Sequence, residues 1–205
     1  MLRRLIPLAR MLMGAIYLIN GLNWWVKMIS PYPSMSDFVN MPPPPDVVGA
    51  MIQNGILFHL VKATEVAAGL ALLSNRFVPL ALVSVLPVTF PIFIVDVFFI
   101  AHLRGMVMGG GSLLLNLFLL LAYLGHYRPL LSSRGVLDLE GNAATIDDSA
   151  SIASPLAKLF RPAMPMLAIL AVATGLLMLG WLTILIGQYI TNPLPLSAVI
   201  PARDH

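Results

Sequence analysis

The sequence predicts an all-α membrane protein, in which a four-helix transmembrane bundle is followed by a fifth, C-terminal transmembrane helix. Of its 205 residues, 59% are hydrophobic and only 10% are charged, whereas a soluble domain carries about 25% charged residues. The mean hydropathy is +0.89. A folded chain of about 150–200 residues still exposes about 30% of its unfolded surface, and so few charges cannot cover that surface in water. Lipid is therefore the solvent that this composition fits.

Five apolar stretches are long enough to cross a bilayer. A helix rises 1.5 Å per residue, so about 20 residues are needed to cross about 30 Å of hydrocarbon. The stretches that meet this requirement are 6–28, 48–74, 77–100, 107–127 and 164–188. The first is too long for a signal sequence and shows no small-residue cleavage site, so we expect it to be a retained helix.

Prolines and glycines mark the connections and bends. The run Ser30–Pro45 is rich in prolines, which lack a backbone donor, and this predicts a short external loop after the first span. Residues 74–76 are enough for a tight antiparallel hairpin. The third span contains three prolines and should be kinked at its middle, and glycines 109–111 of the fourth span favour close helix packing.

The chain divides into three parts. Residues 1–131 form the four-helix transmembrane domain, 132–163 a cytoplasmic polar linker on the membrane surface, and 164–205 the fifth helix and a tail. The linker has no amphipathic period long enough for a stable domain. We therefore expect the linker and fifth helix to be a module appended to the bundle.

Basic residues set the orientation. Eight lie on the side of the N-terminus and three on the other: Arg3, Arg4, Arg10, Arg76, Arg128, Arg134, Lys158 and Arg161, against Lys27, Arg104 and Arg203. The positive-inside rule then places the N-terminus in the cytoplasm and the C-terminus outside, as in a multi-pass protein of a bacterial inner membrane. Trp24 and Trp25 fit an aromatic belt at the outer interface.

Polar groups inside the hydrocarbon are the candidate site, because each costs a few kcal/mol unless it has a partner. Spacing of three residues puts His59, Lys62 and Glu65 on one broad face of the second span, and we expect Lys62 and Glu65 to pair. The full candidate set adds residues of three other spans: Lys62, Glu65, His59, Asn20, Asn23, Asp96 and Asn116. Together they predict a polar track from the outer surface to mid-membrane, which fits a closed hydrogen-bond network as well as it fits a ligand or proton path.

Several chemistries are not supported by any motif. The chain has no cysteine, so disulfides and thiolate metal sites are excluded. His59 and His126 lie about 10 Å or more apart in depth, too far to share a haem iron, and no residue pair has metal-ligand helix spacing. The sequence shows no phosphate-binding loop, no nucleophile elbow and no basic patch for nucleic acid, so we assign no catalytic or metal residues.

Motifs along residues 20–130 resemble those of the DoxX-like family of small bacterial membrane proteins. The motifs are Ile19–Asn23, Met41–Pro45, the run from Lys62 through Glu65 and Gly69 to Pro79, Pro87-Val88 and Tyr127–Leu130. The resemblance implies a four-helix bundle and a loose association with quinone-linked membrane complexes. This chain departs from the family pattern at Pro91 and Asp96, where similar sequences commonly have Asn and His.

Three functions remain open at this point. The first is an accessory, non-catalytic membrane subunit that binds a quinone or another small ligand, with the lipid bilayer, redox-complex subunits or further copies of itself as partners. The second is a small transporter or proton-conducting protein that uses Lys62, Glu65 and Asp96. The third is a membrane enzyme that acts on a quinone or lipid.

Overall fold

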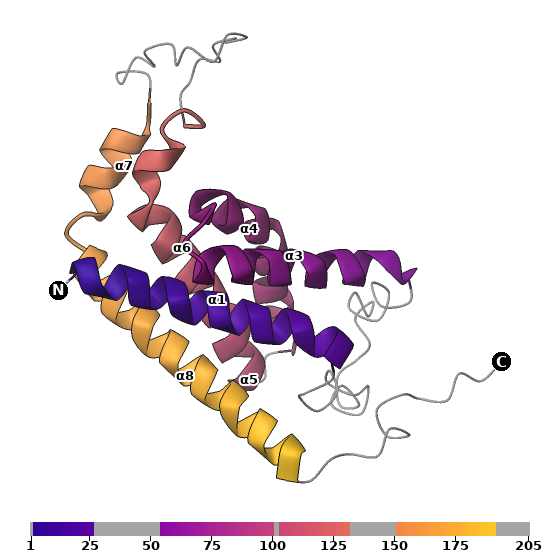
Figure 1. The fold of residues 1–205 in the computed structure, drawn as a ribbon. Helices are drawn as coiled ribbons and strands as arrows, with labels where there is room; N and C mark the ends of the chain where they lie inside the picture. Colours follow the sequence, from indigo (N-terminus) through magenta and orange to yellow (C-terminus); the bar gives the residue numbers. More distant parts are fainter. Residues whose placement is uncertain (1, 27–53, 101–102, 132–150, 192–205) are drawn as a thin grey trace.

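A computed structural model describes residues 2–26, 54–100, 103–131 and 151–191, and every regular element in them is helical (Figure 1). Two short π-helical segments and one 3-10 turn interrupt the α-helices. The elements are α1 (Leu2–Val26), α3 (Ile56–Leu73), α4 (Val78–Ile94), η2 (Val95–Ile100), α5 (Leu103–Gly105), η3 (Met106–Gly110), α6 (Gly111–Ala122), η4 (Leu124–Tyr127), α7 (Ala153–Phe160) and α8 (Met164–Thr191).

Four of the described helices are long and apolar enough to cross a membrane. They cover Arg4–Val26, Ile56–Leu73, Val78–Phe99 and Met164–Gln188. The prediction of a full fourth span over 107–127 needs correction, because the apolar helix there is the shorter Met106–Ala122. It ends where Tyr123 leaves helical geometry and the chain tightens into η4, so it rises about 26 Å, short of a typical hydrocarbon core.

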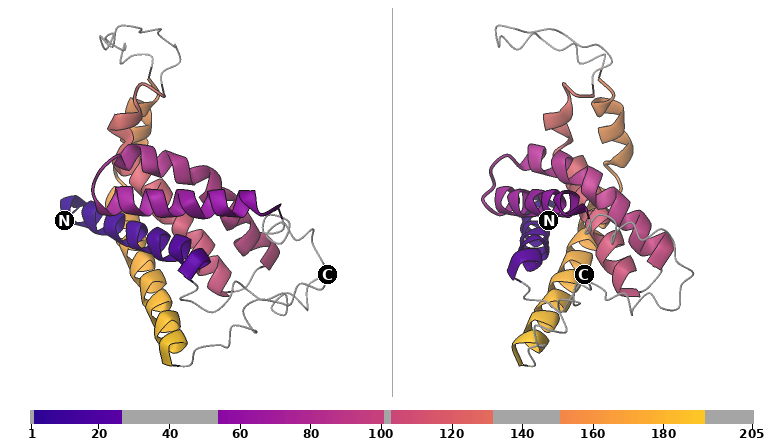
Figure 2. Two further views of the ribbon diagram at one scale, coloured as in Figure 1. Left: turned by 45° about the vertical axis from the view of Figure 1, so that its right-hand side comes forward. Right: turned by 90° about the vertical axis from the view of Figure 1, so that its right-hand side faces the viewer.

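Helices α1 and α3 form the closest antiparallel pair, and glycines make this possible (Figures 1 and 2). A Cβ added at Gly69 of α3 would lie 2.7 Å from the backbone N of Leu18 and 2.9 Å from the carbonyl O of Gly14. A Cβ added at Gly21 of α1 would lie 3.0 Å from the Lys62 carbonyl O. The two backbones are therefore in direct contact, as in small-residue packing in membranes.

The turn between α3 and α4 is tight, as the sequence predicts. Side chains of α1 and η4 form hydrogen bonds to it. Asn75 and Phe77 adopt left-handed conformations there, with φ of 57° and 53°. The Arg10 guanidinium of α1 donates to the Asn75 side chain. The Tyr127 hydroxyl of η4 donates to the Pro79 carbonyl at 2.9 Å, so the ends of α1, α3, α4 and α6 meet at one end of the bundle.

The fifth predicted span, α8, belongs to the same core as the other helices. Ala168, Ala171 and Met178 are fully buried in a single apolar cluster with residues of α1, α3, α4 and α6. Gly175 faces Leu12 of α1, where an added Cβ would lie 3.1 Å from the nearest atom. This packing does not fit the expectation of an appended module, although the domain boundary at residue 131 stays a prediction.

The predicted linker contains a helix. Its residues 151–163 include α7, which lies beside the 124–131 segment and projects from the bundle (Figures 1 and 2). Helix α7 has only eight residues, too few for a periodicity search of about 11–18 residues to find. The predictions for the external loop including Met41–Pro45, for residues 132–150 and for the tail from Asn192 lie outside the described residues.

Candidate functional site

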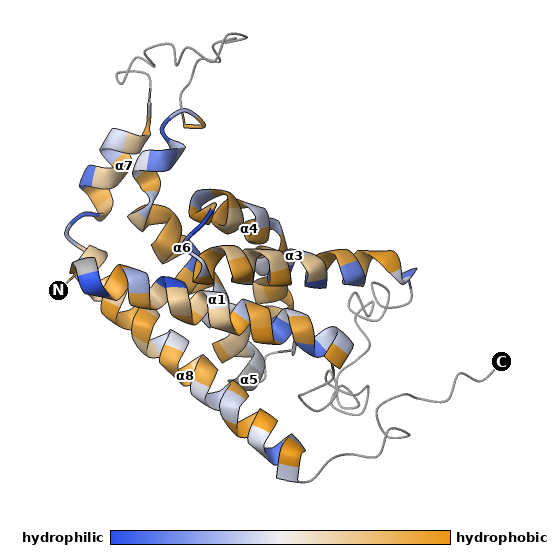
Figure 3. Ribbon diagram, in the orientation of Figure 1, coloured by the Kyte–Doolittle hydropathy of each residue, from blue (hydrophilic) through white to orange (hydrophobic). Residues whose placement is uncertain are grey.

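The candidate site lies between α1 and α3, where polar side chains of the two helices face each other. In Figure 3, hydrophilic positions occur on both α1 and α3, whereas α4, α6 and α8 are mainly hydrophobic. Close packing at Gly21 and Gly69 brings these side chains within hydrogen-bond distance. The close backbone packing of α1 and α3 therefore sets where these polar atoms lie.

The predicted ion pair between Lys62 and Glu65 is present. Lys62 Nζ lies 2.9 Å from Glu65 Oε2, and the two side chains are 4% and 0% exposed. Asn20 of α1 donates from Nδ2 to the same carboxylate oxygen at 2.9 Å. The Glu65 carboxylate therefore joins α3 to α1, and three of the seven predicted residues form one cluster, in which Lys62 and Glu65 are buried and Asn20 is half-buried.

The second carboxylate oxygen of Glu65 has no such partner. Glu65 Oε1 is buried and accepts no hydrogen bond from any group in the described part of the chain. A buried acceptor without a donor costs about 1–3 kcal/mol, and more when the group is charged. This oxygen is therefore an acceptor position available to a hydrogen-bond donor from outside the cluster.

Aromatic side chains close the cluster on the side toward the C-terminal end of α1 and the N-terminal end of α3. The Phe58 ring lies 5.3 Å from Lys62 Nζ, and Trp24 packs edge-on against Phe58 with ring centroids 4.6 Å apart. Trp24 also donates from its indole nitrogen to Nδ1 of the exposed His59 at 3.0 Å. His59 is thus linked to the cluster through Trp24. The Phe58 ring lies over the Lys62 ammonium group.

A buried hydroxyl pair missing from the predicted set lies on the side toward the N-terminal end of α1. Tyr17 of α1 and Thr89 of α4 are hydrogen-bonded to each other through their hydroxyls, and both are buried. Tyr17 precedes Asn20 by three residues, so the helical spacing used for α3 also extends the polar face of α1 to Tyr17. Thr89 carries no comparable signal, because its contact depends on how α1 and α4 pack.

Two predicted residues serve other contacts. Asn116 of α6 is fully buried and donates to the Leu82 carbonyl of α4 at 3.2 Å, which ties α4 to α6. Asp96 lies in the π-helical segment η2 and packs on η3, where a Cβ added at Gly109 would come within 2.8 Å of it. The close packing expected from glycines 109–111 is thus confirmed, and the single polar track is not.

Asn23 is buried on α1, about one turn from Asn20 toward the C-terminal end of the helix. It belongs to the same polar face of α1 as Asn20. Along the antiparallel pair, Asn20 is level with Glu65 and Trp24 is level with His59, and the depth of these residues in a membrane stays a prediction.

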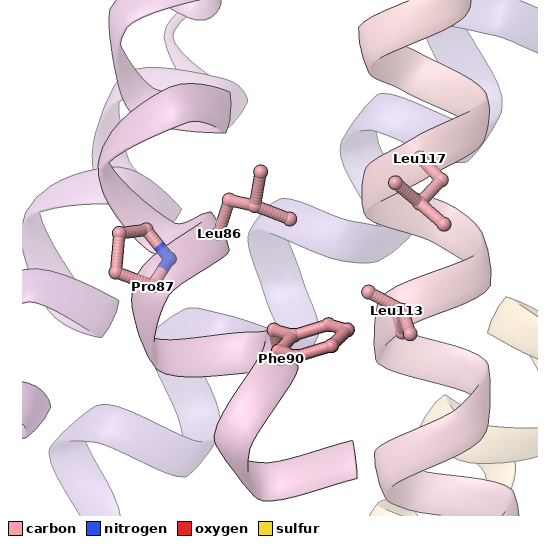
Figure 4. Close-up of a pocket in the computed structure, with 5 residues that line it drawn as sticks. All are labelled: Leu86, Pro87, Phe90, Leu113 and Leu117. Atoms are coloured by element: carbon pink, nitrogen blue, oxygen red, sulfur yellow. The ribbon is translucent and has the colours of Figure 1, made fainter. Parts of the chain in front are cut away.

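A groove of about 440 Å³ lies outside the polar cluster. It is lined by Leu86, Pro87 and Phe90 of α4 and by Leu113 and Leu117 of α6 (Figure 4). All five side chains are apolar, so this groove offers a quinone carbonyl no hydrogen bond. Hydrogen-bonding chemistry for a small ligand is instead found at the Lys62 cluster.

These features fit an all-α, multi-pass membrane protein with a buried charged cluster between two helices. No group of three or more His, Asp or Glu side chains in the described ranges could hold a metal ion. Comparison of the chain with protein-family models, with curated proteins and with solved structures finds no match.

Proposed function

We propose that this chain is a DoxX-like accessory subunit of a bacterial inner-membrane complex, and that it binds a small quinone-type ligand at Lys62, Glu65 and Asn20. In this proposal the N-terminus is cytoplasmic and the C-terminus periplasmic, in accord with the distribution of basic residues. The proposal is supported by the resemblance of the 20–130 motifs and by the charged cluster that two of those motifs bring together.

The observation that carries the proposal is the unsatisfied Oε1 of Glu65. A carboxylate oxygen accepts hydrogen bonds, and the hydroxyl of a reduced quinol donates one. The Lys62 ammonium has three donors, and one of them reaches Glu65 Oε2 at 2.9 Å. A quinol hydroxyl that donates to Oε1 would satisfy this oxygen.

Access to the cluster requires a side chain to move. Lys62 and Glu65 are almost completely buried, and Phe58 covers the ammonium from the outer side. A ligand would enter past Phe58 and Trp24, whose aromatic rings then flank its ring. The proposal therefore includes rotation of Phe58 as the step that opens the site.

A transmembrane proton or solute path is the second candidate, favoured by the Tyr17–Thr89 hydroxyl pair that extends the polar cluster inward. Beyond this pair, however, the core toward the inner end is apolar and closely packed, with Met13, Leu82 and Val85 at 0–1% exposure. The buried Asn116 donates to the Leu82 carbonyl in this part of the core, but no hydrogen bond among the described residues joins Asn116 to the Tyr17–Thr89 pair, so the arrangement favours a site reached from one side.

Native mass spectrometry of the protein extracted in mild detergent tests the proposal. The wild-type protein should retain a quinone or quinol, and Glu65→Gln combined with Lys62→Met should not. Asn116→Leu is the matched control, because it removes a buried amide from the α4–α6 contact and should leave the ligand bound. Absence of any quinone from the wild-type protein after reconstitution with added quinol would refute the assignment, and solute movement in liposomes would favour the transport function.

A further inference from the structure

Three buried side-chain atoms of the described residues lack a hydrogen-bond partner, and two of them are acceptors. The acceptors are Glu65 Oε1 of α3 and Asn116 Oδ1 of α6, whereas the third atom, Arg10 Nε of α1, is a donor. Arg10 precedes Asn20 by ten residues, which is about 15 Å along the helix, so this donor lies away from the polar cluster. The interior of the bundle therefore lacks a hydrogen-bond donor at two places.

The donors of the cluster are directed to one oxygen of the Glu65 carboxylate. Lys62 Nζ and Asn20 Nδ2 each lie 2.9 Å from Oε2, and neither forms a hydrogen bond to Oε1. The Glu65 side chain is 0% exposed, and a charged oxygen forms stronger hydrogen bonds than a neutral carbonyl oxygen does. The position beside Oε1 therefore favours a ligand group that donates a proton, such as a hydroxyl.

The aromatic side chains beside the cluster do not distinguish a donor from an acceptor. Phe58 lies over the Lys62 ammonium group, and Trp24 packs edge-on against Phe58. The indole N–H of Trp24 donates to His59 Nδ1 at 3.0 Å. The faces of these rings can pack against the flat ring of a quinone or of a quinol. They contribute to the affinity for both forms, so selection between the two falls to Glu65.

A quinone and its quinol differ at the atoms that would meet Glu65 Oε1. The carbonyl oxygens of a quinone accept hydrogen bonds and donate none, whereas the hydroxyls of a quinol also donate. A quinone carbonyl against Oε1 brings two acceptors together without a proton between them, and an unpaired polar contact of this kind is costly in a buried site. A quinol hydroxyl in the same place donates to the charged oxygen.

We propose that Glu65 Oε1 determines the specificity of the site, so that the cluster binds a quinol in preference to the quinone with the same ring and tail. This inference rests on the function proposed above and adds the oxidation state of the ligand. A hydrogen bond to a charged group changes an affinity by about ten- to hundredfold, which sets the expected preference. Because the quinol is bound more tightly, the bound ligand is easier to reduce than the free ligand.

The test measures the binding of three ligands to the full chain in mild detergent, by isothermal titration calorimetry without oxygen. The ligands are a short-chain benzoquinone, its quinol, and the dimethyl ether of that quinol, which keeps the ring but has no hydroxyl. The wild-type protein should bind the quinol about ten- to hundredfold more tightly than it binds either of the others. This comparison needs no variant, so it decides the proposal even where a substitution prevents folding.

Two variants assign the preference to its atom. Lys62→Met with Glu65→Met removes the acceptor together with its partner charge, and it should lower the affinity for the quinol by about ten- to hundredfold while the affinity for the quinone stays nearly the same. Asn116→Leu removes the other buried acceptor and is the matched control, which should keep the wild-type preference. Melting in detergent identifies a variant that fails to fold.

The outcomes separate this inference from the proposed function. If the wild-type protein binds the quinol and the quinone equally, or binds the dimethyl ether as tightly as the quinol, the selection by Oε1 is wrong and the proposed function stands. A preference for the quinol that persists without Glu65, or that is lost in Asn116→Leu, would overturn the assignment to Glu65 Oε1. If the wild-type protein binds neither the quinol nor the quinone, both the inference and the proposed function are wrong.

Discussion

Replacing either Lys62 or Glu65 alone is expected to destabilise the bundle much more than replacing both. Lys62→Met leaves the Glu65 carboxylate at 0% exposure with Asn20 as its remaining hydrogen-bond donor in the described residues. Glu65→Gln leaves the ammonium of a side chain that is 4% exposed without its carboxylate. Each single variant therefore strands one charge in the interior.

The magnitude follows from the geometry of the pair. At the observed 2.9 Å, the Coulomb attraction is about 6 kcal/mol for an effective dielectric constant of about 20. Burial of the two charges costs several kcal/mol each, so the intact pair contributes little net stability, and losing one partner costs about 3–5 kcal/mol. At about 2–4 °C per kcal/mol for a chain of this size, the melting temperature should fall by roughly 6–20 °C.

The double variant, Lys62→Met with Glu65→Gln, removes both charges while nearly keeping the volume. Its Gln side chain still offers an oxygen to Asn20 Nδ2, so it should melt within about 4 °C of wild type. Thermal melting in detergent measures all three variants. Thr64→Val, which alters a hydroxyl bonded only to its own helix, is the control at similar depth.

A double-mutant cycle contains the result that would refute this reasoning. If both single variants melt like wild type, the two charges are not coupled. If the losses simply add in the double variant, the coupling energy is zero, and Lys62 and Glu65 stabilise the bundle independently of each other. If stability returns in the double variant while a bound quinol is lost, the pair serves binding.

Three further predictions concern packing and topology. Gly69→Leu should push α1 and α3 apart, because even its Cβ meets backbone at 2.7 Å, and should lower the free energy of unfolding by about 1–3 kcal/mol. Gly180→Ala is the control: no atom lies within 4 Å of an added Cβ there, so this variant should melt at or above the wild-type temperature. Equal melting temperatures of the two variants would contradict the close contact between α1 and α3 at Gly69. Truncation after Leu131 should make the remaining bundle sensitive to protease, since α8 residues fill the core; a resistant fragment would show that residues 132–205 are dispensable. A periplasm-active phosphatase fused after residue 40 or 205 should be active and one fused at 145 silent, and activity at 145 would overturn the orientation.

The buried pair could be predicted from the sequence because the membrane restricts the options. A charged side chain in hydrocarbon must find a partner, and Lys62 and Glu65 are three residues apart on a helix. Asn20 followed from its depth on a neighbouring helix, given the antiparallel order of the spans. Helix depth and charge pairing are thus enough to find residues that interact across adjacent helices.

Contacts that depend on how helices rotate against each other could not be predicted. Asn116 and Glu65 have similar expected depths, but Asn116 bonds to α4, because depth does not say which face of α6 looks inward. Thr89 is one of many hydroxyl residues, and only the packing of α1 on α4 gives it Tyr17 as a partner. The position of α8 in the core depends on close contacts such as that of Gly175 with Leu12, which hydropathy does not report.

The cluster between α1 and α3 is better explained by binding than by stability. Apolar side chains of similar volume would hold two helices together as well or better, by about 1–4 kcal/mol, than a buried ion pair does. The glycine contacts at Gly14, Gly21 and Gly69 already supply close packing, so the helices do not need the charges to associate. The Glu65 carboxylate also retains an oxygen that no described donor satisfies, which adds a further cost. A hydrogen-bond donor that occupies this position offsets that cost only when it is bound, which is the energetic arrangement expected of a preorganised ligand site.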